Sequence, residues 1–200
     1  MLFTKNDKIG SYTVAFPHKQ GSYAETYRVK DQNGKTQFLK LINYSKLNRN
    51  QFDDDGRVIE IEIAKRLKHH NLCQLIESGS MMMNGGQFAW FVTEFVSGET
   101  LSQRIIRDDN ISVYDIKVIA KAVLSALSFL HSQPSPIIHN EVTIQNVLLN
   151  LTAGFQDLKL IDFGNACFLD QHPVKLHLNE FNPFYLAPER FSGVSSVQAD

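Results

Sequence analysis

This sequence has few cysteines and almost no net charge. Its 200 residues include only two cysteines, Cys73 and Cys167, without a CxxC spacing, which favours free thiols in a reducing compartment over a disulfide framework or a zinc site. The formal net charge is −1, so electrostatics give no reason to expect nucleic acid or an anionic membrane as a partner.

Long apolar runs are absent as well. The first residues lack the apolar core of a signal peptide, and no stretch approaches membrane-spanning length. We therefore expect a cytoplasmic protein without a membrane partner. The hydrophobic content of 43% suffices for one domain or for two small lobes that share a cleft.

The first half of the chain is rich in strand patterns. Asn33-Gly34 and Asn84-Gly85-Gly86 are hairpin signals between runs of β-forming residues. Alternating apolar and charged residues over 57–67 predict one helix. The expected strands are Tyr12–Phe16, Glu25–Lys30, Thr36–Asn43, Leu72–Ser80 and Phe88–Phe95. Together they predict a five-stranded antiparallel sheet with one helix.

The second half begins with a long helix. Ser112 is a favourable N-cap with Asp115 in the first turn, and the helix is expected to end near Ser132, before Pro134. Its predicted buried stripe runs from Ile116 to Leu130. Two short strands follow, Asn146–Asn150 and Leu158–Ile161. A β-rich lobe followed by a helical one predicts an α+β fold with a cleft at the junction.

Six segments, taken in order, resemble the protein kinase signature set. They are Phe38-Leu39-Lys40-Leu41, Glu60 ahead of Leu67–Leu72, the hinge-like Val92–Glu99, His139-Asn140-Glu141 with Asn146–Leu149, Asp162-Phe163-Gly164, and Ala187-Pro188-Glu189. The resemblance implies a bilobal kinase-like fold, with the N-lobe over residues 1–96 and an incomplete, mainly helical C-lobe over residues 97–200. Tyr185, where tyrosine kinases usually have Trp, implies the Ser/Thr type.

The same resemblance implies ATP and Mg²⁺ as cofactors. Lys40 would hold the α- and β-phosphates with Glu60 as its ion-pair partner, and Asn146 and Asp162 offer hard oxygen ligands for Mg²⁺. Glu141 would be the catalytic carboxylate beside Lys40, Asn146 and Asp162. The expected nucleotide contacts are Gly21, Ser22, Tyr23, Ala24, Thr26, Phe38, Lys40, Glu60, the gatekeeper Thr93, Glu94, Val96 and Leu148.

The sequence departs from the family pattern at the catalytic loop. Glu141 stands where kinases carry Asp, which lengthens the arm of the base by one methylene. Thr143 replaces the catalytic-loop Lys, and Asn182 replaces the activation-segment Thr that bonds both Asp and Lys. Since all three belong to one hydrogen-bond cluster, we expect impaired phosphotransfer.

Two further departures concern the nucleotide. The loop at Gly21 retains one of the three family glycines, so close backbone approach to phosphates is less easy. Phe38 stands two residues before Lys40, where kinases have a small Ala. The phenyl group either fills part of the adenine pocket or stacks on the base, and the sequence leaves both open.

Regulation by Ser/Thr phosphorylation within the activation segment is excluded by composition. Asn140 replaces the Arg that normally receives the phosphate, and no Ser or Thr lies between Gly164 and Ala187. Asp200 resembles the first Asp of the scaffold helix, which in the family bonds the catalytic-loop backbone. With the rest of that lobe absent, the apolar face of the 112–132 helix would require the missing chain or a partner.

The leading hypothesis is a Ser/Thr-type kinase-like domain that binds ATP and Mg²⁺, transfers phosphate poorly, and works as a signalling or binding module. The alternative is an active but slow Ser/Thr kinase with Glu141 as base and a protein as substrate. A small-molecule phosphotransferase of related fold is disfavoured because those enzymes lack a segment like Ala187-Pro188-Glu189.

Overall fold

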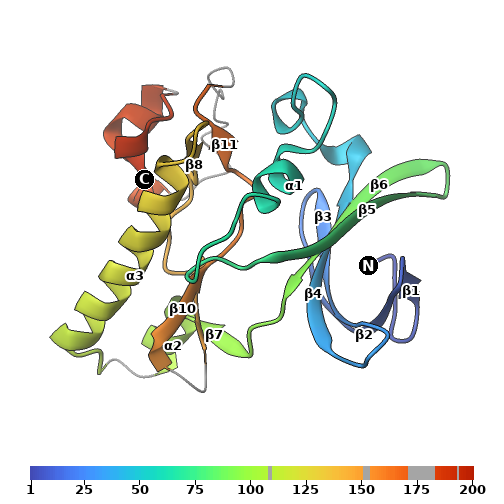
Figure 1. Cartoon of the computed structure of the whole chain (residues 1–200), viewed down its shortest axis with the longest axis horizontal. Coiled ribbons are helices and arrows are strands. Elements are labelled where there is room, and N and C mark those ends of the chain that lie inside the picture. Colours follow the sequence, from blue (N-terminus) through green and yellow to red (C-terminus); the bar gives the residue numbers. More distant parts are fainter. Residues whose placement is uncertain (108–109, 151–153, 171–182, 193) are drawn as a thin grey trace. The chain divides into compact units, whose positions relative to one another are not determined.

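The computed structural model describes residues 1–107, 110–150, 154–170, 183–192 and 194–200. The chain divides into two compact units, and its helices and strands are labelled in Figure 1. The first unit comprises Met1–Ile61 and Gln74–Phe95, and the second comprises Glu62–Cys73 and Val96–Asp200.

The first unit, which is described throughout, is built on one antiparallel sheet. Its strands are β1 (Lys8–Ile9), β2 (Tyr12–Gln20), β3 (Ala24–Lys30), β4 (Thr36–Asn43), β5 (Leu75–Met83) and β6 (Gly86–Glu94), in the order β1-β2-β3-β4-β6-β5. The prediction of five strands was wrong by one. The added strand, β1, pairs Ile9 with Tyr12 across a tight turn in which Gly10 has a φ of 58°. Two residues are too few to produce a recognisable alternation of apolar and polar positions.

The hairpin turns were predicted correctly. Gly34 has a φ of 78°, and Asn84 and Gly85 have φ values of 52° and 75°. In the β5–β6 turn both central residues, Asn84 and Gly85, have left-handed backbone, which gives a turn whose twist matches that of the flanking strands. In the β3–β4 turn the left-handed residue is Gly34, a conformation that glycine adopts without steric cost. The β3–β4 and β5–β6 pairs are thereby fixed in register.

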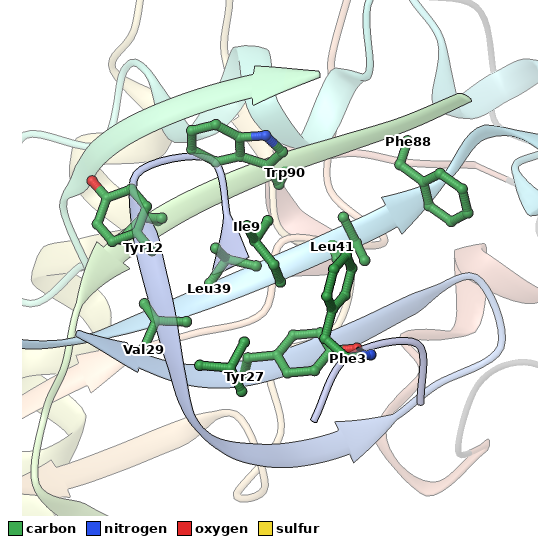
Figure 2. Packing of buried hydrophobic residues seen from close by; sticks show 11 residues of the cluster. Phe3, Ile9, Tyr12, Tyr27, Val29, Leu39, Leu41, Phe88 and Trp90 are labelled. Carbon is green, nitrogen blue, oxygen red and sulfur yellow. Dashed lines mark hydrogen bonds between the residues drawn. The ribbon is translucent and has the colours of Figure 1, made fainter. Parts of the chain in front are cut away.

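One face of this sheet packs around the single tryptophan. Trp90 lies in β6 among the buried side chains that Figure 2 shows. A Cβ atom added to Gly10 or Gly79 would lie 2.8 or 2.5 Å from its indole ring. Only glycine therefore leaves room for the ring at these two positions. The buried cluster consists of Phe3, Ile9, Tyr12, Val14, Tyr27, Val29, Leu39, Leu41, Phe88, Trp90 and Val92.

A second cluster contains Ala24, Ile42, Val58, Ile61, Ala89 and Phe91. Val58 and Ile61 lie just before and within the helix α1 (Ile59–Ala64). Side chains alternate along a strand, so Lys40 points away from the side of β4 that carries Leu39 and Leu41. This alternation brings Lys40 to the side on which Glu60 of α1 lies.

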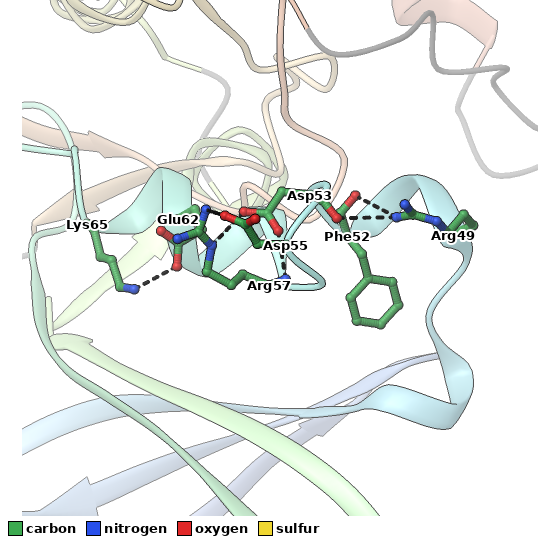
Figure 3. Close-up of polar contacts among 7 residues, drawn as sticks. All are labelled: Arg49, Phe52, Asp53, Asp55, Arg57, Glu62 and Lys65. Carbon is green, nitrogen blue, oxygen red and sulfur yellow. Dashed lines mark hydrogen bonds and ion pairs between the residues drawn. The ribbon is translucent and has the colours of Figure 1, made fainter.

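Helix α1 is shorter than the predicted 57–67 at both ends, and it begins two residues late because the chain before it forms a turn, in which the Asp53 N–H donates to the Arg57 carbonyl at 2.9 Å. Arg57 donates its backbone N–H to Oδ1 of Asp53 at 2.7 Å and its Nε to Oδ2 at 2.8 Å, and it also pairs with Asp55 (Figure 3). Phe52 and Val58 form an isolated antiparallel bridge. These contacts prevent residues 57 and 58 from joining the helix.

The described part of the second unit has two main helices and two small sheets. The helices are α2 (Leu101–Arg107) and α3 (Val113–His131). One sheet has three strands in the order β10 (Gly154–Leu160), β9 (Val147–Asn150) and β7 (Gly98–Thr100). The other sheet pairs β11 (Cys167–Phe168) with β8 (Ile137–Ile138). The mixed α+β class is confirmed. No helix in the described ranges combines the length and apolar content needed to cross a membrane.

Helix α3 begins where the sequence predicted. Ser112 Oγ accepts from the backbone N–H of Asp115 at 3.1 Å, and Asp115 accepts from the backbone N–H of Ser112 at 3.0 Å, so the two residues form a capping box. The predicted buried stripe is correct only near the C-terminal end, where Leu127 and Leu130 are buried, whereas Ile116 is 55% exposed. Within the described residues, β8 and β10 are the strands that pack extensively against α3.

Candidate functional site

In the first unit, Lys40 forms a three-residue polar group with Glu60 and Tyr23. Its Nζ lies 2.6 Å from Oε1 of Glu60, and these side chains are 12% and 7% exposed, so the expected ion pair is present and largely buried. Tyr23 joins it, since its hydroxyl accepts from Lys40 at 3.2 Å and donates to Glu60 at 3.4 Å. The ammonium group also lies 5.2 Å from the Tyr23 ring centroid. Such contacts hold the lysine charge in one orientation.

The predicted phosphate loop is a short turn between β2 and β3. Gly21 donates its N–H to the carbonyl of Ala24 at 2.8 Å, and a Cβ on Gly21 would lie 3.2 Å from that oxygen. Thr26 Oγ1 donates to the Lys19 carbonyl at 3.3 Å. Ser22 is exposed and Ala24 buried. The retained glycine therefore stands at the tightest point of the turn.

Two aromatic rings meet where the resemblance places the adenine. Phe38 in β4 lies directly opposite Thr93 in β6, and its ring meets that of His18 edge-on, with centroids 5.7 Å apart. The sequence analysis predicted that β2 ends at Phe16, so it did not identify His18 as a neighbour of Phe38. In the structure this strand continues to Gln20 and includes His18. Burial, followed by the charges of Arg28 and Lys19, lowers the pKa of His18.

The remaining predicted base contacts fall in both units. Thr93 is buried and donates Oγ1 to the carbonyl of Glu94 at 3.3 Å. Val96 and Leu148 belong to the second unit, with Leu148 in β9.

Within the second unit, the β9–β10 pair brings Asn146 and Asp162 together. Val147 pairs with Leu160, and one residue further on Ile161 donates its N–H to the Asn146 carbonyl at 2.9 Å. The Asn146 side-chain nitrogen donates to the Glu141 carbonyl at 3.0 Å, whereas its amide oxygen receives no hydrogen bond from the described residues. Asp162 is exposed and has a φ of 65°.

These two oxygen donors fit Mg²⁺. An amide whose nitrogen is already engaged presents its oxygen as a hard ligand, and a carboxylate supplies the charge. Among the described residues, no group of three or more His, Cys, Asp or Glu could hold a metal. Mg²⁺ commonly takes only one or two protein ligands, with water and phosphate oxygens completing its octahedron, so the pair is sufficient.

The loop expected to be catalytic is held by Asp200, as its resemblance to the first Asp of the scaffold helix implied. The Asp200 carboxylate accepts the backbone N–H groups of His139 and Asn140, each at 2.7 Å. His131, at the end of α3, places Nε2 3.0 Å from the same carboxylate. Burial lowers the pKa of His139, whose Nε2 lies 3.2 Å from the Ile161 carbonyl. A neutral His139 with its proton on Nε2 satisfies this contact.

Glu141 has a side-chain partner that the sequence reasoning missed. Asn165, directly after Asp162-Phe163-Gly164, donates Nδ2 to Oε2 of Glu141 at 3.0 Å. Thr143 is buried and brings no positive charge to the loop. Asn182, the other expected member of this cluster, lies outside the described residues. The carboxylate is therefore held from the segment after Gly164.

Asn140 lies in a buried hydrogen-bond cluster. It has a φ of 68°, which asparagine tolerates better than arginine does. Its Nδ2 donates to the Asn165 carbonyl at 2.8 Å and to Cys167 Sγ at 3.3 Å. Its Oδ1 accepts from Ser195 Oγ at 3.3 Å, and Ser195 in turn accepts from the buried Arg190. Internal bonds thus occupy the side chain that replaces the family's phosphate-binding Arg.

Comparison with known sequences gives a match over most of the chain. The model of the protein kinase domain matches residues 19–199. The chain is 34% identical over 174 residues, 85% of its length, to serine/threonine-protein kinase TIO of Arabidopsis thaliana. It is 30% identical over 187 residues, 92% of its length, to a titin homolog of Caenorhabditis elegans. It is 30% identical over 170 residues, 81% of its length, to a probable serine/threonine-protein kinase of Dictyostelium discoideum. The chain spans only 12%, 1% and 15% of the lengths of these three relatives.

Proposed function

The chain belongs to the protein kinase domain family, and from this premise we propose that it binds Mg·ATP, transfers the γ-phosphate slowly, and serves mainly as a signalling or binding module of the Ser/Thr type. Residues 1–96 would form the N-lobe and residues 97–200 part of the C-lobe. A cytoplasmic location and a protein partner remain predictions.

The Lys40–Glu60 ion pair carries this proposal. Its separation of 2.6 Å and its burial keep an ammonium group oriented, as binding of the α- and β-phosphates requires. Phosphoryl transfer depends mostly on positioning and on neutralisation of phosphate charge, so an intact lysine supports nucleotide binding even where the base is altered. When bound, Mg²⁺ would neutralise phosphate charge beside Asn146 and Asp162.

The slow transfer follows from the residues around the base. Thr143 supplies no charge for the γ-phosphate, and the Glu141 arm is one methylene longer than that of aspartate. Misplacement of a catalytic group by about 1 Å can cost on the order of a hundredfold in rate.

A second candidate is an active Ser/Thr protein kinase in which Glu141 is the working base. The hydrogen bond from Asn165 favours it, because a carboxylate in one fixed orientation meets a requirement for general base catalysis.

Nucleotide binding is tested by calorimetric titration of the purified protein with Mg·ATP. We expect binding that Lys40→Met weakens at least tenfold and that the exposed-site control Lys35→Met leaves unchanged. Asp162→Ala should weaken binding only when Mg²⁺ is present. No heat at millimolar Mg·ATP would overturn the proposal.

Transfer is tested with a generic Ser/Thr substrate and with the protein itself as acceptor. We expect a low rate that Asp162→Ala abolishes. Robust wild-type transfer that disappears in both Asp162→Ala and Glu141→Gln would overturn the slow-transfer proposal and establish the second candidate.

A further inference from the structure

Asn165 has no assigned role, yet it makes a direct side-chain contact with the candidate base. Its Nδ2 lies 3.0 Å from Oε2 of Glu141, and both residues belong to the second unit. We propose that Asn165 positions the Glu141 carboxylate for phosphotransfer and replaces the support that the altered loop has lost. This inference rests on the proposed function in one respect, since it requires residual transfer.

The backbone of Glu141 is held on both sides, so its side chain is the part that needs support. Its N–H donates to Nδ1 of His139 at 3.3 Å, and its carbonyl accepts from Asn146 at 3.0 Å. The Asp200 carboxylate holds the two preceding N–H groups. A glutamate has one more side-chain torsion than an aspartate, and a hydrogen bond to Oε2 restricts it.

Strand pairing explains why Asn165 lies beside Glu141. Cys167 of β11 pairs with Ile138 of β8 in antiparallel register. Two residues before Cys167, the chain therefore comes next to the residues that follow Ile138. Asn140 also holds the backbone of Asn165, because its Nδ2 donates to the Asn165 carbonyl at 2.8 Å. Asn165 is thus anchored through its backbone and acts through its side chain.

The chemistry of the contact suits a base. An amide donor on Oε2 stabilises the ionised carboxylate without taking up a proton. In the step itself, the attacking hydroxyl oxygen forms a bond to the γ-phosphorus of ATP, and its proton passes to Glu141. The bond from phosphorus to the β–γ bridging oxygen breaks, and ADP leaves. Asn165 touches no reacting atom and is a positioning residue.

The first measurement detects the contact without requiring activity. A double-mutant cycle of Glu141→Ala and Asn165→Ala on the free energy of unfolding should give a non-zero coupling. Asn150→Ala is the matched control, because Asn150 donates Nδ2 to Asp157 Oδ2 at 2.8 Å in the same unit. We expect no coupling between Glu141→Ala and Asn150→Ala.

The second measurement assigns the role. Asn165→Ala should lower kcat for phosphotransfer by about tenfold or more and leave KM for ATP unchanged. Where transfer is too slow to follow, kcat for ATP hydrolysis is measured instead. Asn165→Asp, which replaces the donor by a second carboxylate, should lower kcat further. In a Glu141→Asp background, whose shorter arm does not reach Asn165, the loss caused by Asn165→Ala should shrink. Asn150→Ala should leave kcat unchanged.

The outcomes separate the two proposals. The inference would be overturned by any one of three results. These are zero coupling between Glu141→Ala and Asn165→Ala, a kcat that Asn165→Ala leaves unchanged, and a wild-type protein that binds Mg·ATP but shows neither transfer nor hydrolysis. Absence of Mg·ATP binding would instead be a failure of the proposed function, and the coupling would still report whether the contact exists. Coupling together with a selective fall in kcat supports the inference.

Discussion

At the level of single residues, the length of residue 141 is matched to its surroundings. Oε2 of Glu141 reaches the Asn165 amide at 3.0 Å, and an aspartate there would end about 1.5 Å earlier. The loop is therefore adjusted to a glutamate, and restoring the family residue alone removes a contact without supplying the absent lysine.

Raising phosphotransfer is expected to require changes at residues 141, 143 and 182 together. Glu141→Asp alone should not raise phosphotransfer, because Thr143 still provides no charge near the γ-phosphate. Adding Thr143→Lys and Asn182→Thr should raise the rate at least tenfold over Glu141→Asp alone. The measurement is γ-phosphate transfer to a Ser/Thr substrate by the single and triple variants. A rate increase from Glu141→Asp alone would contradict the prediction.

His139 makes stability depend on pH. Burial lowers the pKa of its ring below the ordinary value of 6.5, so the folded protein favours the neutral form while the unfolded chain still binds a proton near 6.5. The stability associated with the neutral ring is complete above pH 6.5 and is lost as the pH falls below it, by at most about 1.4 kcal/mol per pH unit.

Denaturant unfolding between pH 7.5 and 5 tests this dependence. The wild-type free energy of unfolding should fall with pH, and His139→Gln should show a shallower slope. Equal slopes in the wild type and in His139→Gln would show that another group controls the effect.

At the level of elements, local sequence chemistry decided what could be predicted. Ser112, the Asn33-Gly34 turn and the Asn84-Gly85 turn each act through contacts within a few residues, so their elements were placed correctly. The start of helix α1 was predicted two residues early because it is set by Arg57 and Asp53, whose contact depends on the fold of the loop and does not appear as periodicity. The two-residue strand β1 has no periodic signal at all.

The cap of α3 provides a test at this scale. Ser112→Ala removes the acceptor for the Asp115 N–H at the start of a 19-residue helix and should cost about 1 kcal/mol of stability. Ser128→Ala, at an exposed position within the same helix, should be neutral or slightly stabilising. The free energy of unfolding by urea measures both. Equal effects of the two variants would mean that the cap contributes nothing.

At the level of the whole molecule, the sequence predicted one close side-chain pair of the candidate site and missed other side-chain contacts there. The Lys40–Glu60 pair follows a known motif spacing and is present at 2.6 Å. Tyr23, His18 and Asn165 were missed as contacts because each partner is distant in sequence: Glu60, Phe38 and Glu141 lie 37, 20 and 24 residues away. Such contacts depend on strand register and side-chain torsions, which a single sequence does not reveal.

Trp90, whose indole ring lies close to Gly10 and Gly79, also provides an intrinsic fluorescent probe. It is the only tryptophan of the chain, so its fluorescence reports on the first unit alone. Ser112→Ala lies in the second unit and should shift the urea midpoint seen by far-ultraviolet circular dichroism while the tryptophan emission midpoint stays in place. Equal shifts of both signals would mean that the two units unfold as one cooperative body. Without any label, this emission therefore distinguishes one folding unit from two.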